Sequence, residues 1–202
     1  MNNNEYDYVD LGLPSGTLWA TQNVGASKPS EAGLYFQWGD TQGYTKEQVG
    51  KGEGQKKFAS DWSDYKWNPS GDGETFTKYK TEGEGLELED DAVHANMGGD
   101  WHMPSSEQIQ ELINETTSNW IKLNGINGRL FTSKNGKSIF IPAAGYAWND
   151  SLLSEGSEAD IWSSMLYASS VFYGQYLGFS SSNVGLDYYY RYYGFSVRGV
   201  IG

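Results

Sequence analysis

The spacing of apolar residues predicts one clear amphipathic helix, over residues 106–115. From Ile109 onward, apolar side chains recur at positions i, i+3 and i+4, which places them on one helical face. Ser105 and Gln108 stand three residues apart at the start of this pattern and form a capping box, which marks a helix N-terminus. A second, shorter helix is expected over residues 90–96, at the end of an acidic run. The predicted helical content is therefore small.

The other apolar runs are short and are bounded by turn residues, which is typical of β-strands. We expect strands at residues 8–11, 17–20, 34–38, 145–148, 161–164, 172–179 and 193–201. A hairpin is expected over residues 131–140, because Asn135-Gly136 supplies the two positive φ angles of a type I′ turn. The sequence thus predicts an α+β fold with two short helices and a largely antiparallel sheet.

A single domain over residues 1–202 accounts for the length of the chain. Residues 41–85 are polar and rich in Gly, Lys and Ser, so we expect a long insertion with little regular structure. Trp62, Tyr65 and Trp67 are isolated aromatic residues within it and are candidates to attach it to the rest of the domain. A loop of this length is uncommon inside a compact domain and is often functional.

The formal charge of −12 argues against nucleic acid or an anionic membrane surface as a partner, because both attract clustered Lys and Arg. No stretch approaches about 18 apolar residues, so no membrane insertion is expected. The chain has no cysteine, which excludes disulfides and thiolate nucleophiles. Its first residues lack the basic and apolar regions of a signal peptide, so none is expected in this chain.

Residues 166–202 have an unusual composition. They hold eight of the 15 tyrosines and contain no Lys, Glu, Trp or Met. Tyrosine mixed with Ser, Gly and Asp is typical of recognition surfaces, because tyrosine gives a large, rigid contact area and the small residues let it fit. Five tyrosines occupy the six positions 188–193, and neighbours in a strand face opposite sides, so some rings must face outward. A tyrosine-rich pair of core strands is the alternative.

Several stretches of the chain resemble one family of proteins. They are residues 8–20 (Tyr-Val-Asp-Leu-Gly-Leu-Pro-Ser-Gly-Thr-Leu-Trp-Ala), 98–104 (Gly-Gly-Asp-Trp-His-Met-Pro), 139–146 (Ile-Phe-Ile-Pro-Ala-Ala-Gly-Tyr), 161–164 (Ile-Trp-Ser-Ser) and 194–200 (Gly-Phe-Ser-Val-Arg-Gly-Val). In this order they resemble signatures of surface domains abundant in gut Bacteroidetes. Two positions depart from the pattern: Gln22 stands where many relatives have Cys, and His102 where relatives usually have Arg.

Within that group the chain is most similar to the variable proteins of diversity-generating retroelements. The resemblance implies a C-type-lectin-like fold, related to that of the formylglycine-generating enzyme. In these systems template adenines are mutated, so an Asn codon in the template becomes almost any residue except Trp, Met, Lys, Glu or Gln. Residues 166–202 contain one residue of that set, Gln175. The alternative explanation is that β-strands are simply poor in Lys and Glu.

The resemblance further implies that the diversified side chains form one exposed ligand-binding face on a fixed scaffold. We expect the ligand-binding positions to be Leu166, Tyr167, Phe172, Tyr173, Tyr176, Ser180, Ser182, Asp187, Tyr188, Tyr189, Tyr190, Tyr192 and Tyr193, within a variable region at about 163–202. The expected scaffold residues are Trp162, Phe179, Val197 and Arg198. Arg191 is expected to give the binding face polarity.

A binding module of this kind recognises a protein or glycan ligand on a cell surface. The expected location is the cell surface, the extracellular space or a phage tail fibre. The alternative function is that of a carbohydrate-binding, lectin-like surface domain without diversification, in which Tyr and Trp rings stack on sugars.

The sequence holds no strong motif for catalysis, so an enzyme is not expected. His94 and His102 lack a nearby carboxylate motif and form a weak metal signal. The acidic residues 82–91 lack the spacing of a calcium loop. Residues 148–150 (Trp-Asn-Asp) are similar to a strand of calcium-binding lectins, but the partner loop of those lectins is missing. We expect no metal and no other cofactor, and leave calcium as an open alternative.

Overall fold

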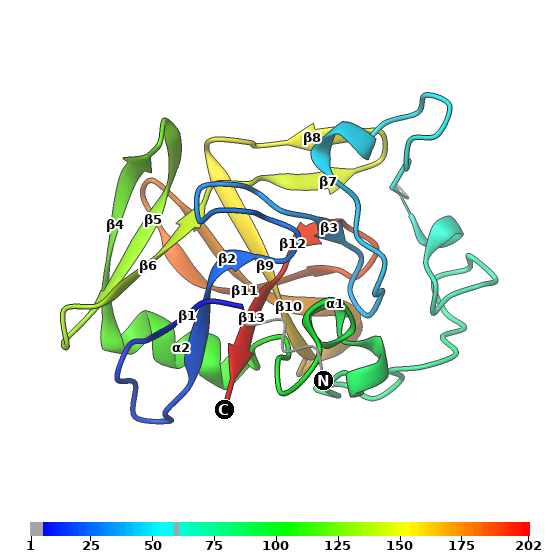
Figure 1. The fold of residues 1–202 in the computed structure, drawn as a ribbon. Helices are drawn as coiled ribbons and strands as arrows, with labels where there is room; N and C mark the ends of the chain where they lie inside the picture. Colours follow the sequence, from blue (N-terminus) through cyan, green and yellow to red (C-terminus); the bar gives the residue numbers. More distant parts are fainter. Residues whose placement is uncertain (1–5, 59–60) are drawn as a thin grey trace.

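The computed structural model describes residues 6–58 and 61–202 (Figure 1). These residues form two α-helices and thirteen β-strands, and the strand pairings are antiparallel except for one. The predicted α+β class with mostly antiparallel strands is therefore confirmed. The strands are divided among four sheets, of three, five, three and two strands, rather than forming the single sheet that the sequence predicts.

The first and last strands of the described chain meet in one three-stranded sheet. Strands β1 (Tyr8–Asp10) and β13 (Arg198–Ile201) flank β2 (Leu18–Asn23), and both pair with it in antiparallel fashion. Segments from opposite ends of the sequence thus belong to the same sheet. This sheet lies in front of the central strands in Figure 1.

A five-stranded sheet crosses the centre of the molecule in the order β11-β10-β9-β12-β3. Its strands are β3 (Tyr35–Phe36), β9 (Glu158–Tyr167), β10 (Ser170–Ser180), β11 (Val184–Tyr190) and β12 (Phe195–Ser196). Strands β9 and β10 contain the predicted segments and extend beyond them. Strand β11 was not predicted, because its run of tyrosines has no apolar alternation. The single strand predicted at 193–201 is wrong, since β12 and β13 belong to different sheets.

Two smaller sheets complete the strands. One contains β4 (Thr116–Leu123), β5 (Ile126–Ser133) and β6 (Ser138–Pro142), and the other pairs β7 (Tyr146–Trp148) with β8 (Ser151–Leu153). The predicted hairpin at 131–140 corresponds to the facing ends of β5 and β6. Strand β4 was not predicted.

The turn chemistry of the β4–β6 sheet differs from the prediction. Asn124 and Gly125 both have positive φ, 51° and 85°, and join β4 to β5 in the two-residue geometry of a type I′ turn. Between β5 and β6 the left-handed residue is Gly136 (φ 84°), while Asn135 stays outside that region. The Gly136 amide donates to the Ser133 carbonyl at 3.0 Å, which fits a three-residue loop ending in a left-handed glycine. The type I′ assignment of Asn135-Gly136 is therefore wrong.

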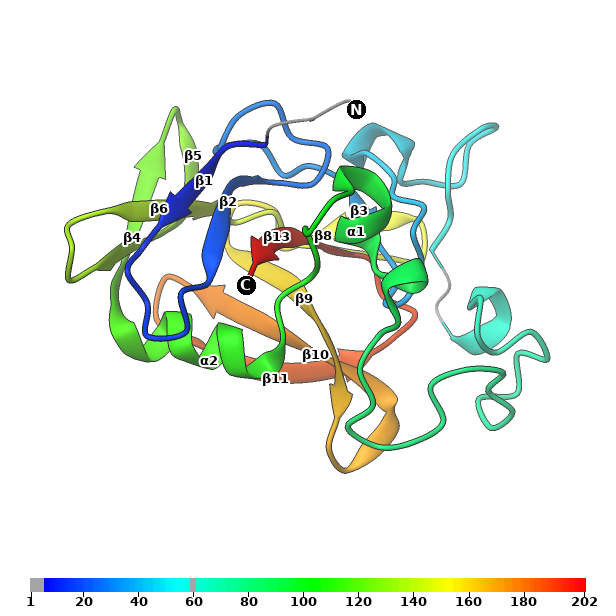
Figure 2. The ribbon, with the colours of Figure 1, turned by 60° about the horizontal axis from the view of Figure 1, so that its bottom comes forward.

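Helix α2 (Ser106–Glu115) begins and ends where the sequence predicts. Its capping box is present: the Gln108 amide donates to the Ser105 hydroxyl at 3.2 Å, and the Ser105 amide donates to the Gln108 side chain at 2.9 Å. The apolar face of the helix, with Ile109 and Leu112, packs in a cluster with apolar residues of β9 and β10. In Figure 2, α2 lies beside β11 and closes this face of the sheet.

Helix α1 (Ala92–Met97) begins two residues later than predicted, because Asp91 is its N-cap and accepts a hydrogen bond from the His94 amide at 2.9 Å. The residues before it form a 3₁₀ turn, η3 (Leu88–Asp90). The helix ends at Gly98, as the sequence indicates. The longest helix among residues 6–58 and 61–202 has ten residues, so none of them could cross a bilayer.

The insertion at 41–85 has little regular structure over its described residues, which agrees with the prediction. It contains two short 3₁₀ turns, η1 (Lys46–Gln48) and η2 (Trp62–Asp64), and follows one side of the molecule (Figures 1 and 2). It nevertheless contributes to the core, because Tyr65 and Phe76 are buried in the same cluster as central aromatic residues of the sheet. The insertion is thus part of the folded body.

Arg198 connects the sheet of β1, β2 and β13 to the sheet of β4, β5 and β6. Its side chain is fully buried and donates to the Asn23 side chain at 2.9 Å and to the Phe140 carbonyl at 3.0 Å. Burial lowers the pKa of Arg198 to about 9, so the guanidinium stays charged at neutral pH. The expected scaffold residues Trp162, Phe179 and Val197 are also buried.

Candidate ligand-binding surface

The β10–β11 hairpin carries most of the predicted ligand-binding residues. In its register Tyr173 pairs with Tyr190, and Gln175 with Tyr188. The next pair along the hairpin, Tyr176 with Asp187, points to the other side of the sheet, because successive strand residues alternate between faces. The predicted set is therefore divided between two faces of one hairpin.

One face bears a cluster of aromatic side chains that we call the aromatic surface. It consists of Tyr167, Tyr173, Tyr188 and Tyr190, and the Phe172 ring lies at its edge, 6.4 Å from the Tyr173 ring between centroids. The rings of Tyr167 and Tyr188 stack with centroids 3.8 Å apart, and Tyr173 lies 5.4 Å from Tyr188 and 4.8 Å from Tyr190. Phe172 and Tyr188 are 38% and 41% exposed, so the cluster presents apolar area to solvent.

Two hydroxyl groups of this cluster, those of Tyr173 and Tyr188, have a raised pKa. The neighbouring Tyr190 hydroxyl, together with partial burial, raises the pKa of Tyr173 to about 12. Charge repulsion from Tyr167, followed by a hydrogen bond with its hydroxyl, raises the pKa of Tyr188. The aromatic surface therefore offers ring faces and hydroxyl groups to a partner, which is the chemistry of a recognition surface.

Aromatic side chains of the insertion pack against the edge of the aromatic surface. The Trp62 ring lies 6.0 Å from Phe172, 6.1 Å from Tyr190 and 4.9 Å from Tyr192, measured between centroids. Phe76 lies 6.0 Å from Phe172. The sequence predicts that Trp62 attaches the insertion to the rest of the domain, and the structure identifies the aromatic residues that it contacts.

Three predicted ligand-binding residues lie in the core, so their expected exposure is wrong. Leu166, Tyr192 and Tyr193 are 1%, 7% and 9% exposed. Leu166 belongs to the central aromatic cluster, and Tyr193 stacks on the Trp148 ring with an interplanar angle of 9°. Both rings after Arg191 turn inward because the chain leaves β11 there and enters the core. Tyr189 remains 41% exposed, on the face opposite the aromatic surface.

Arg191 is also buried rather than exposed on the binding face. Its side chain has no exposed area, and its guanidinium carbon lies 4.1 Å from the Phe76 ring centroid and 5.4 Å from that of Tyr65. One nitrogen, Nη1, donates to the Tyr79 carbonyl at 3.1 Å. Burial lowers the pKa of Arg191, and the aromatic faces around it offset part of the cost of burying the charge. Arg191 thus attaches the end of β11 to the insertion.

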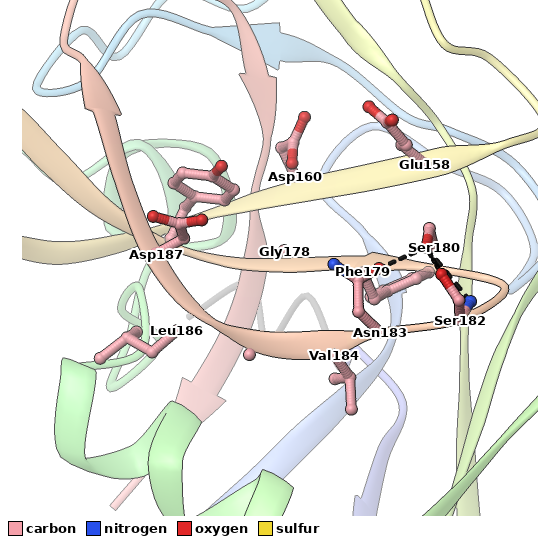
Figure 3. Close-up of a pocket in the computed structure, with 12 residues that line it drawn as sticks. Glu158, Asp160, Gly178, Phe179, Ser180, Ser182, Asn183, Val184, Leu186 and Asp187 are labelled. Atoms are coloured by element: carbon pink, nitrogen blue, oxygen red, sulfur yellow. Dashed lines mark hydrogen bonds between the residues drawn. The ribbon is translucent and has the colours of Figure 1, made fainter.

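The opposite face of the hairpin holds a hollow of about 380 Å³. Four predicted ligand-binding residues line it: Tyr176, Ser180, Ser182 and Asp187. Glu158 and Asp160 of β9 complete its acidic side, and we call this site the acidic hollow. Figure 3 shows Glu158, Asp160 and Asp187 on the same side of the sheet, with Val184 and Leu186 directed away.

Two glycines, paired across β10 and β11, create the space in the acidic hollow. Gly178 lies opposite Gly185 in the register. A methyl group at Gly178 would lie 2.8 Å from the Tyr176 ring and 3.7 Å from the Asp160 carboxylate. A methyl group at Gly185 would meet no atom within 4 Å. The Tyr176 ring and the Asp160 carboxylate therefore converge over Gly178, while Gly185 leaves the hollow open.

Asp160 is the most perturbed acid of the hollow. Its side chain is 8% exposed, and burial, followed by the charges of Glu158 and Asp187, raises its pKa to about 8. Across the described residues no hydrogen-bond donor or cationic side chain reaches its carboxylate. No sequence pattern pointed to this residue, because Asp160 lies outside the tyrosine-rich region.

Within the acidic residues at 82–91, three carboxylates of the described chain lie close enough to one another to hold a metal ion. They are those of Glu87, Glu89 and Asp90. The Lys78 ammonium donates to all three, at 2.5, 2.7 and 2.7 Å. The cation held there is therefore a lysine of the same chain. Elsewhere, the Asp150 carboxylate pairs with Lys51 at 3.2 Å.

The two histidines have separate structural contacts. The Nδ1 atom of His94 lies 3.2 Å from the Trp101 carbonyl, and that of His102 lies 2.9 Å from the Met103 carbonyl. Neither belongs to a group of potential metal ligands among the described residues.

Comparison with models of protein families, with characterised proteins and with solved structures finds no match for this chain.

We predict that Arg191→Ala lowers the free energy of unfolding by about 3 kcal/mol, because it leaves a cavity among buried aromatic rings. Urea unfolding followed by tryptophan fluorescence measures the change. Ser182→Ala, on the exposed turn of the same hairpin, is the control and should change stability by less than about 0.5 kcal/mol. Equal stability of the two variants would contradict a structural role for Arg191.

We also predict that Asp160 makes stability depend on pH. Its pKa is raised in the folded state, so its contribution is present at low pH and is lost as the pH rises toward about 8. Asp160→Asn removes this loss, so the variant should be more stable than the parent by at least about 2 kcal/mol at pH 9 and similar to it near pH 4. Urea unfolding at a series of pH values tests this, with Asp100→Asn, an exposed acid remote from the hollow in sequence, as control; parallel curves for parent and Asp160→Asn would refute it.

Proposed function

We propose that the protein is a ligand-binding variable protein of a diversity-generating retroelement, with a C-type-lectin-like fold. It binds a protein or glycan on a cell surface, from a bacterial surface structure or a phage tail fibre. The observation that carries the proposal is the aromatic surface: half-exposed rings from β9, β10 and β11 gathered on one face of a rigid sheet.

The arrangement of the family-like motifs supports this proposal. His102, in one motif, bridges to Val200 in another, and the Trp162 ring stacks on Phe195 at 4.0 Å. These contacts join segments from distant parts of the sequence into one buried scaffold. The tyrosines of the aromatic surface lie outside these motifs. A diversified binding protein requires that its variable residues be separate from the residues that hold its scaffold together.

The physics of the aromatic surface suits broad recognition. Tyrosine rings bury large areas with little loss of conformational entropy, and a few such rings dominate the affinity of a typical interface. Contacts within the cluster and with Trp62 hold the rings in place before a ligand arrives. Pre-organisation of this kind lowers the entropic cost of binding.

The retroelement assignment predicts a specific feature of the neighbouring DNA. A near-copy of the 3′ end of the coding sequence should lie close by and differ at adenines, next to a reverse transcriptase gene. Sequencing the flanking DNA tests this. A coding sequence without such a repeat would remove the retroelement from the proposal and leave the lectin-like alternative.

Binding through the aromatic surface predicts a strong effect of Tyr188→Ala. Affinity for a ligand found on a glycan array or in a displayed-peptide library should fall by on the order of 2 kcal/mol, roughly 30-fold, because a central aromatic anchor is lost. The melting temperature should change little, since the Tyr188 ring is 41% exposed.

Tyr8→Ala is the matched control for this variant. Tyr8 is 54% exposed and lies on β1, in a different sheet. Loss of binding in both variants, or unfolding of Tyr188→Ala, would argue against a specific binding role for the aromatic surface. Binding confined to sugars would favour the lectin-like alternative.

A further inference from the structure

The acidic hollow has the features of a binding site that lacks its positive partner. Three carboxylates line it, from Glu158, Asp160 and Asp187, and within the described chain no lysine, arginine or histidine pairs with any of them. Asp160 is more than nine-tenths buried, faces the hollow and has no hydrogen-bond partner among the described residues. A buried acid without a partner is costly, so a complementary cation would stabilise it.

We infer that the acidic hollow binds the guanidinium group of an arginine side chain presented by a protein partner. This inference deepens the proposed binding function, because four of the residues that line the hollow belong to the predicted set. It rests on its own observations, however, because the hollow and the aromatic surface lie on opposite faces of the hairpin.

The spacing of the acids favours an organic cation over a metal ion. Among the described residues, Glu87, Glu89 and Asp90 form the group whose carboxylate oxygens lie within 4.8 Å of one another. The acids of the hollow are spread more widely than that. A calcium ion needs oxygens at about 2.3–2.6 Å on several sides, which places them closer together. The volume of about 380 Å³ also exceeds the space that a single ion requires.

The wall of the hollow favours a planar cation. The Tyr176 ring lies over Gly178 beside the Asp160 carboxylate, so a ring face and an acid border the same space. A guanidinium group stacks on aromatic rings, and its five N–H donors reach several carboxylate oxygens in one plane. An ammonium group lacks this planar fork. An arriving guanidinium would also lower the raised pKa of Asp160, as an opposite charge does.

The open side of the hollow fits a side chain delivered by another molecule. Gly185 leaves free space above the sheet, and Ser182 and Asn183 are exposed at the rim. A peptide backbone would find hydrogen-bond groups at this rim while its arginine side chain enters the hollow. The net charge of −12 further favours basic partners.

The test is a titration of the full chain with Nα-acetyl-arginine amide, followed by the amide NMR signals of Gly178 and Gly185. We expect saturable shifts at both positions with millimolar affinity. The neutral isostere Nα-acetyl-citrulline amide should produce none. Equal shifts with citrulline, or no saturable shift with arginine up to about 50 mM, would overturn the inference.

Two further probes examine the identity of the cation. Nα-acetyl-lysine amide should bind at least about tenfold more weakly, because it lacks the planar fork. Equal affinity for the lysine probe would overturn the choice of arginine. Calcium chloride that saturates the same signals at lower concentration would overturn the choice of an organic cation.

Variants separate this site from the aromatic surface. Asp187→Asn and Asp160→Asn should each weaken binding of the arginine probe at least about tenfold, and Gly185→Val should block it by filling open space. Tyr188→Ala should leave the titration unchanged, since that ring lies on the opposite face. Unchanged binding in Asp187→Asn, which is exposed and should fold normally, would refute the site even if the aromatic surface binds its own ligand.

Discussion

Alternation of side chains along the paired strands β10 and β11 is the constraint on which the binding surfaces depend. Each pair across the hairpin must face one side or the other, so a tyrosine-rich sequence cannot be displayed on a single face. Tyr173, Tyr188 and Tyr190 fall on one side, and Tyr176 and Asp187 on the other. Moving the register by one residue would exchange these two sets.

The β10–β11 hairpin is held in place by contacts at both of its ends. Helix α2 and the apolar cluster around Leu177 support one end. At the other end the insertion packs against the hairpin, with Trp62 against Tyr190 and Arg191 enclosed by aromatic rings. A buried guanidinium with one strong acceptor is tolerated where aromatic faces surround it. The irregular insertion therefore gives the recognition strands a fixed base.

The two faces differ in the chemistry that they offer. The aromatic surface presents neutral rings and hydroxyl groups, and the acidic hollow presents carboxylates around a gap left by two glycines. Rings supply contact area, whereas charges supply orientation and selectivity for a partner. A ligand that reached around the edge strand β11 would meet both kinds of group.

Local sequence patterns are sufficient to predict the elements whose signals are short in range. The capping box at Ser105 and the spacing of Ile109 and Leu112 predict α2, because helix formation depends on residues three or four positions apart in the sequence. The composition of residues 166–202 likewise indicated exposed tyrosines. Asn124-Gly125 is a local turn signal of the same short range, and it marks the hairpin of β4 and β5.

Which residues of the tail face solvent depends instead on tertiary packing. Tyr192 and Tyr193 resemble Tyr188 and Tyr189 in sequence, yet they lie in the core because the chain turns inward at Arg191. The acidic character of the hollow arises because β9 lies beside β10, which brings Asp160 close to Asp187 across the sheet. Burial and cross-strand proximity depend on how distant segments pack, and no local pattern in the sequence contains that information.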